Sequence, residues 1–158
     1  MVGTWMGSMD LDDLDIGLLR LLQVNSRVSF ADLSRELDVA EATVRFRVKR
    51  LVNEGVIAKF TIMLDPNKVG RRVSGAILLK IDPTHLEGVC RLLVEFVETM
   101  YLFQSTGEYD VVSVVVARDL EHLNDLVKRA KAIVGVKDAR VSIATQFLKF
   151  DPFVSLNL

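Results

Sequence analysis

The fold is decided by residues 29–51, SFADLSRELDVAEATVRFRVKRL, because apolar residues recur there at helical spacing in two successive runs. The two runs consist of Phe30, Leu33 and Leu37, followed by Val44, Val48, Leu51 and Val52. Ser29 is a suitable cap for the first helix, and Asp38-Val39 can make a turn between the two. The stretch therefore predicts two short helices joined by a tight turn, which is a helix-turn-helix.

The second of these helices has a face that suits DNA. Opposite its apolar stripe it presents small, basic and aromatic side chains, and in a major groove both bases and phosphates lie within their reach. Taken alone, basic residues on one helix are equally well explained as a solvated face. The DNA contacts that we expect, with Arg47 and Arg50 as phosphate anchors, are Ser29, Ala42, Thr43, Arg45, Phe46, Arg47, Lys49 and Arg50.

Three motifs around this pair occur in a fixed order. They are Leu-Asp-x-x-Asp from Leu11, Arg-x-Ser-x-x-x-Leu from Arg27, and Arg-x-x-Arg-Leu-x-x-x-Gly-Val-Ile from Arg47. In this order and at these spacings, residues 11–70 resemble the DNA-binding half of the leucine-responsive regulator (Lrp/AsnC) family of bacteria and archaea, and the similarity continues to about Phe150. The resemblance implies a transcription regulator that binds double-stranded DNA as a homodimer, with dimers assembling further into an octamer.

The chain departs from the family pattern at two positions on the second helix. Ala40 stands where the family usually has a serine cap, and alanine cannot accept a bond from the free amides of the helix start. Phe46 stands where many relatives carry a polar or basic residue. Two roles are open for Phe46, which are packing on a thymine methyl group and packing on a neighbouring segment of the protein.

The rest of the chain predicts a second domain. A first helix over residues 12–24 precedes the pair, a trailing strand over residues 56–64 follows it, and a hinge covers residues 65–72. Residues 73–150 alternate as strand, helix, strand, strand, helix, strand, which predicts a ferredoxin-like βαββαβ domain for sensing and oligomerisation. The predicted class is α+β, with a winged helix-turn-helix domain over residues 11–64 and tails over residues 1–10 and 151–158.

Composition limits the classes of function. Hydrophobic residues make up 50% of the 158 residues, and we assign the excess to buried subunit interfaces because the longest apolar run is too short for the roughly 20 residues of a membrane helix. The net charge of −1 argues against a generally basic nucleic-acid binder, yet residues 41–59 carry a local charge of +3. A single cysteine, Cys90, excludes an internal disulfide and fits a cytoplasmic protein.

A second candidate site is the turn Gly107-Glu108-Tyr109-Asp110. A purely structural role as a hairpin turn would account for the glycine, which can adopt an unusual backbone conformation, but would not require the tyrosine. The family resemblance implies that this turn borders a small-molecule pocket between adjacent dimers, where amino acids are the usual ligands. Asp110 would pair with the ligand ammonium, and Thr145, on the predicted last strand, matches a frequent polar position near that pocket.

We expect no catalytic centre, metal site or cofactor. His85 and His122 fall in the first turns of two predicted helices and are expected to be solvated, and no metal-ligand spacing or nucleophile motif occurs. Two alternatives to a DNA-binding regulator remain open. One is an enzyme on the same scaffold, because siroheme decarboxylases resemble this family, and the other is a sensor that has lost DNA binding.

Overall fold

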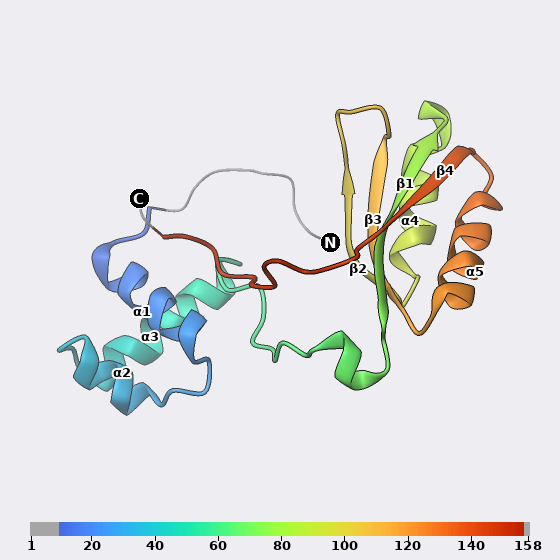
Figure 1. Ribbon diagram of the computed structural model, residues 1–158. Helices are drawn as coiled ribbons and strands as arrows, with labels where there is room; N and C mark the ends of the chain where they lie inside the picture. The colour runs from blue at the N-terminus through green and yellow to red at the C-terminus, as the bar shows by residue number, and fades with distance from the viewer. Residues whose placement is uncertain (1–9, 157–158) are drawn as a thin grey trace. The chain divides into compact units, whose positions relative to one another are not determined.

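The computed structural model describes residues 10–156, which divide into two units (Figure 1). One unit consists of the chain up to Ile62 together with the C-terminal segment from Asp151, and the other is Met63–Phe150. Apart from Asp10, the predicted N-terminal tail lies outside the described residues, as do residues 157 and 158 of the predicted C-terminal tail. No helix among the described residues combines the length and apolar character needed to cross a membrane.

The first unit contains the three predicted helices, α1 (Asp13–Val24), α2 (Phe30–Glu36) and α3 (Glu41–Asn53). Local capping starts the first two, because Asp12 and Asp15 form a reciprocal capping box and Ser29 accepts a bond from the Asp32 amide. Their buried residues form one small core, made of Leu18, Leu22, Leu33, Val44 and Val48. The predicted helix-turn-helix is confirmed.

The turn between α2 and α3 depends on Asp38, which has a φ of 52°. Aspartate tolerates this left-handed conformation better than most residues, because its short side chain can bond locally. Ala40 follows as the cap of α3 and makes no side-chain hydrogen bond there, as its chemistry requires. The start of α3 therefore lacks the side-chain cap that α1 and α2 both have.

The predicted trailing strand over residues 56–64 is absent from the described chain, so this part of the domain prediction was wrong. Gly55, with a φ of 74°, ends α3, and the chain then continues without regular structure to the short 3-10 turn η1 (Pro66–Val69). A strand needs a neighbour for its backbone hydrogen bonds. Within residues 10–156 no strand pairs with this segment, and the side chains of Phe60, Ile62, Met63 and Leu64 are more than half exposed.

The second unit is a four-stranded antiparallel sheet with two helices, α4 (Leu86–Val94) and α5 (Leu120–Lys131). Its strands are β1 (Val73–Ile81), β2 (Thr99–Gln104), β3 (Val111–Ala117) and β4 (Val136–Ile143), in the order β2-β3-β1-β4. Alternate residues of β1 and β3 point toward the helices and are buried, which builds the core around Ile77, Leu79, Val111 and Val115. The predicted ferredoxin-like fold is confirmed.

The other face of this sheet is open and apolar. Tyr101 pairs with Val114 and Phe103 with Val112, so these four side chains lie side by side on one face. Tyr101 is 57% exposed and Phe103 is 51% exposed. An exposed aromatic cluster of this kind is unusual on a surface that stays in water.

Two local predictions from the sequence, a last strand over residues 139–147 and a cap by Thr84 at the start of α4, were wrong. The last strand ends at Ile143 instead of residue 147, because Ile143 already pairs with Gly75 near the start of β1 and little of β1 remains to pair with later residues. Thr84 does not cap α4. Asp82 instead caps a short 3-10 turn, Pro83–His85, by accepting a bond from the Thr84 amide.

The C-terminal segment returns to the first unit and bonds to α1. The Gln23 side-chain amide donates to the Val154 carbonyl at 3.2 Å, and its oxygen accepts from the Val154 amide at 2.8 Å. Arg20 donates to the Leu156 carbonyl at 3.1 Å. Residues 151–156 are therefore part of the helical unit and not a separate tail.

Candidate nucleic-acid interface and ligand loop

The outer face of α3 is accessible to a partner. Val44, Val48 and Leu51 are buried against the core, which turns Ala42, Phe46 and Lys49 into solvent and leaves Thr43 half-buried. Phe46 is 65% exposed. Phe46 therefore does not pack into the core of the helical unit, and most of its ring is available for an external contact.

Arg45 lies at the edge of this face and ties α3 to α2. Its guanidinium is 2.9 Å from Glu41 and lies 5.1 Å from the centre of the Phe30 ring, which is a cation–π arrangement. The side chain still remains mostly exposed. Arg45 can therefore reach a phosphate by giving up an ion pair that contributes little at a surface.

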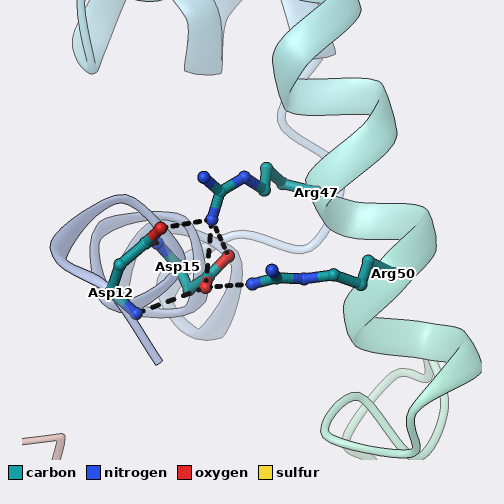
Figure 2. Close-up of polar contacts among 4 residues, drawn as sticks. All are labelled: Asp12, Asp15, Arg47 and Arg50. Atoms are coloured by element: carbon teal, nitrogen blue, oxygen red, sulfur yellow. Dashed lines mark hydrogen bonds and ion pairs between the residues drawn. The ribbon is translucent and has the colours of Figure 1, made fainter. Parts of the chain in front are cut away.

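Arg47 and Arg50 point to a different place, the start of α1 (Figure 2). Arg47 Nη1 lies 2.5 Å from Asp12 Oδ2 and 3.2 Å from Asp15 Oδ1, and Arg50 Nη2 donates to Asp15 Oδ2. The Asp15 side chain is fully buried, while the two arginines are 22% and 30% exposed. The geometry thus gives both arginines intramolecular carboxylate partners, and the prediction that they anchor phosphates needs revision.

The ionisation of this cluster follows from its hydrogen bonds. The pKa of Asp12 is lowered by the backbone amide of Asp15 and then by the Arg47 guanidinium. The pKa of Arg47 is raised in turn, first by its hydrogen bond to Asp12. Both shifts favour the charged forms of Asp12 and Arg47, so this pair is ionised at neutral pH.

Ser29 is also occupied within its own helix. Its hydroxyl accepts from the Asp32 amide at 3.0 Å and donates to Asp32 Oδ2 at 2.6 Å, which lowers the pKa of Asp32. The hydroxyl is thus committed to the cap of α2. A DNA contact at this position would use the exposed helix start as much as the serine oxygen.

The predicted ligand turn is a six-residue loop, residues 105–110, between β2 and β3. Gly107 and Glu108 are exposed, whereas Tyr109 and Asp110 are half-buried. Gly107 does not have a positive φ, and a side chain there would meet Ser105 Oγ at an ordinary 3.6 Å. The expectation that the backbone demands glycine at residue 107 was therefore wrong for this conformation.

Asp110 has partners at the end of β1. Its Oδ2 accepts from the Ile81 amide at 2.7 Å, and its Oδ1 lies 3.8 Å from Lys80 Nζ. Lys80 also donates to the Glu108 carbonyl at 2.6 Å. The loop thus places an ammonium beside a carboxylate, and Lys80 is a candidate site residue that the sequence pattern did not indicate.

Thr145 is not part of this loop site within one chain. It lies beyond the end of β4 and is exposed, next to Ala144, whose amide donates to the Ser74 carbonyl at 2.9 Å. Asp110 bonds at Ile81, the other end of β1. At about 3.3 Å per residue, the seven residues between Ser74 and Ile81 separate the two positions by about 23 Å.

Comparison with known proteins identifies the family. Residues 11–58 match the model of a winged helix-turn-helix DNA-binding domain, and residues 75–153 match the Lrp/AsnC ligand-binding domain. The chain belongs to the Lrp/AsnC family. It is thus a helix-turn-helix transcriptional regulator with a ligand-binding domain, as the sequence motifs predicted.

Relatives of this Lrp/AsnC regulator match along almost the whole chain. The HTH-type transcriptional regulator Ptr1 of Methanocaldococcus jannaschii is 36% identical over 140 residues, which covers 88% of this chain and 95% of the relative. The leucine response regulatory protein LrpA of Mycobacterium tuberculosis has a TM-score of 0.83 at 26% identity, over 91% and 99% of the two chains. A Neisseria meningitidis regulator solved with L-Met shares the fold, with a TM-score of 0.87 at 24% identity over 94% and 98%.

These Lrp/AsnC relatives are transcriptional regulators and not enzymes, so the siroheme-decarboxylase alternative is not supported.

The two histidines differ from each other in the structure. His85 is about half exposed, as expected, but His122 is only 14% exposed. Its Nδ1 accepts from the Arg118 amide at 3.2 Å and its Nε2 lies 3.1 Å from Glu98 Oε1, so the expectation of a solvated His122 was wrong.

Proposed function

We propose that this Lrp/AsnC regulator reads double-stranded DNA in a sequence-specific way through the exposed face of α3. The observation that carries the proposal is the exposed Phe46 beside Lys49, on a helix whose opposite side is fixed to the core. Ala42, Thr43 and Phe46 are the candidates for base contacts, since small and aromatic side chains can approach a thymine methyl group. Arg45 and Lys49, together with the helix start at Ser29, are the candidates for phosphate contacts.

The regulator acts as a homodimer in this proposal. The apolar side chains of Tyr101 and Phe103 on the open sheet face would be shielded from water by a partner. The exposed apolar segment 58–64 has no strand partner in the part of the chain that the structure describes. A second copy supplies a partner for the sheet face and a partner for the segment 58–64, because a two-fold axis brings identical surfaces together. Two recognition helices related in this way require half-sites about 10 bp apart, or a multiple of that spacing.

In vitro selection from random double-stranded DNA tests the DNA-binding function directly. We expect the wild-type protein to enrich one sequence with two-fold symmetry and with half-sites at that spacing. The same selection with Phe46→Ala should enrich a different or less defined sequence. A wild-type selection that enriches nothing would reject the proposal and favour the remaining alternative, a sensor without DNA binding.

We propose further that an amino acid modulates this activity at the loop of residues 105–110. The supporting geometry is the pair formed by Lys80 and Asp110, because an amino acid carries one carboxylate and one ammonium that such a pair can receive. A pocket that also includes Thr145 has to combine two copies, since one chain holds these positions at opposite ends of β1. Such a pocket would form where two dimers meet in a higher oligomer, and we expect that oligomer to be an octamer.

A further inference from the structure

Two of the motifs that mark the chain as a family member meet in one ion-pair cluster. Leu-Asp-x-x-Asp supplies Asp12 and Asp15 at the start of α1, and Arg-x-x-Arg-Leu supplies Arg47 and Arg50 on α3, more than thirty residues later. Figure 2 shows the two guanidinium groups converging on the carboxylates. The proposed DNA contacts use neither of these pairs, so the cluster needs an explanation of its own.

Asp15 is the centre of this cluster and cannot move easily. It is the third residue of α1, where its amide donates to Asp12 Oδ1 at 2.9 Å and its carboxylate receives the Asp12 amide in return. The same carboxylate accepts Arg47 on both oxygens, at 3.2 Å and 3.3 Å, and accepts Arg50 on Oδ2. A fully buried carboxylate with this many donors is held in one position by the backbone of α1.

The two ion-paired residues on α3 fix the rotation of this helix about its axis as well as its distance from α1. Arg47 and Arg50 are three residues apart and therefore project from the same side of the helix. The apolar contacts of Val44 and Val48 are non-directional and oppose a small rotation of α3 only weakly. Phe46 and Lys49 each precede one of the two arginines, so the cluster sets the direction in which these two side chains face outward.

Two further observations make the attachment to Asp15 more important. Ala40 provides no side-chain cap, so the start of α3 has no anchor of that kind. Arg50 Nε is buried without a hydrogen-bond partner among the described residues, so within that part of the chain Asp15 supplies the acceptor for this guanidinium. We propose that Asp15 is a positioning residue for DNA recognition, which acts through Arg47 and Arg50 to set the rotation of α3 and keeps both arginines off the phosphates.

The inference rests on the proposed DNA-binding function, and salt dependence separates it from a phosphate-anchor role. Wild-type protein, Arg50→Gln and Lys49→Gln are titrated with the selected DNA and with random DNA of equal length at several salt concentrations. Lys49→Gln should reduce the slope of log K against log salt by about 0.9 per protomer, the value for one lost phosphate contact. Arg50→Gln should leave the slope unchanged and lower the ratio of specific to random affinity by about tenfold, comparable to the loss of one base contact.

A change of slope in Arg50→Gln as large as that in Lys49→Gln would overturn the inference, because Arg50 would then be a phosphate anchor. A wild-type protein without preference for any DNA would instead reject the proposed function itself. Arg50→Lys keeps a cation beside Asp15 and should recover part of the specificity ratio, while a loss as large as in Arg50→Gln counts against the ion pair.

Asp15→Asn supplies the second test, with Asp13→Asn as its matched control. Asp13 is on the same turn of α1 but is exposed and outside the cluster. Asp15→Asn should lower the specificity ratio by at least the Arg50→Gln factor, and Asp13→Asn should not change it. A folded Asp15→Asn protein with the wild-type ratio would contradict the positioning role, and the Arg50 variants decide the matter if Asp15→Asn does not fold.

Discussion

Replacing Phe103 by alanine should dissociate the proposed dimer while leaving each chain folded. Phe103 lies on the open face of the sheet, paired with Val112, and about half of its side chain is exposed in one chain. The substitution also removes the covered half of the ring, which at about 25 cal/mol per Å² lowers the free energy of unfolding of the monomer by about 2.5 kcal/mol. The exposed half contributes nothing to the monomer, so its loss is expected only at the interface between two copies.

The size of that effect follows from the exposed area. A phenylalanine buries roughly 200 Å² when fully covered, so covering the exposed half removes about 100 Å² from water. At about 25 cal/mol per Å² this contributes about 2.5 kcal/mol for each copy. A two-fold dimer contains the residue twice, which gives about 5 kcal/mol and a dimer dissociation constant weakened by between three and four orders of magnitude.

Sedimentation equilibrium over a range of protein concentrations measures that constant. Phe46→Ala is a matched control, because Phe46 is also a largely exposed phenylalanine but lies on α3. We expect Phe46→Ala to associate like the wild-type protein and Phe103→Ala to be largely monomeric at micromolar concentration. Equal association constants for all three proteins would refute the sheet-to-sheet dimer, as would a wild-type monomer.

Three further predictions test the sites separately. Phe46→Ala should change the DNA sequence preference by roughly 1–3 kcal/mol, as measured on the selected and on random DNA, and an equal loss on both would reject a base contact. In a melting screen of the twenty amino acids, a ligand at about 100 times its Kd should stabilise the protein by about 2.7 kcal/mol. Asp110→Asn, which keeps an oxygen for the Ile81 amide but loses the charge, should abolish that shift, and an undiminished shift would place the ammonium elsewhere. Because its hydrogen bonds lower the pKa of Asp12, the stabilisation from this carboxylate is complete above the unfolded pKa of about 3.9 and is lost as the pH falls through the folded-state pKa. Acid unfolding of Asp12→Asn should therefore depend less on pH below about 4, and superimposable profiles for variant and wild type would contradict this.

The features that the sequence predicted correctly are those set by residues close together in the chain. The apolar spacing of Val44, Val48 and Leu51 is enough to predict which side of α3 is buried, and the cap of α2 joins Ser29 to a residue only three positions later. The exposure of Phe46 follows from the same periodicity. In each case the physical cause lies within one or two helical turns.

The features that it missed depend on partners distant in the sequence. Nothing near Arg50 indicates that its guanidinium pairs with Asp15, 35 residues earlier, and nothing near His122 indicates Glu98, 24 residues earlier. The end of β4 depends on where β1 begins, which placed Thr145 outside the strand. Residues 56–64 have the composition of a strand, but pairing requires a neighbouring strand that residues 10–156 of one chain do not provide.

The ion-pair cluster also changes how the charge of the DNA-binding unit has to be counted. The sequence gives residues 41–59 a charge of +3, but Arg47 and Arg50 are paired with Asp12 and Asp15, and including these two aspartates lowers the charge of the surface to +1. One protomer then has few cations for phosphates, chiefly Lys49 and Arg45, whereas proteins whose DNA affinity depends strongly on salt make some 6–10 phosphate contacts. In the proposed dimer the number of phosphate contacts would double, which would raise the affinity as well as supply the two-fold symmetry. A DNA-binding surface with little net charge binds random DNA weakly. The base contacts of α3, and the orientation that Asp15 imposes on this helix, therefore contribute a larger share of the binding free energy.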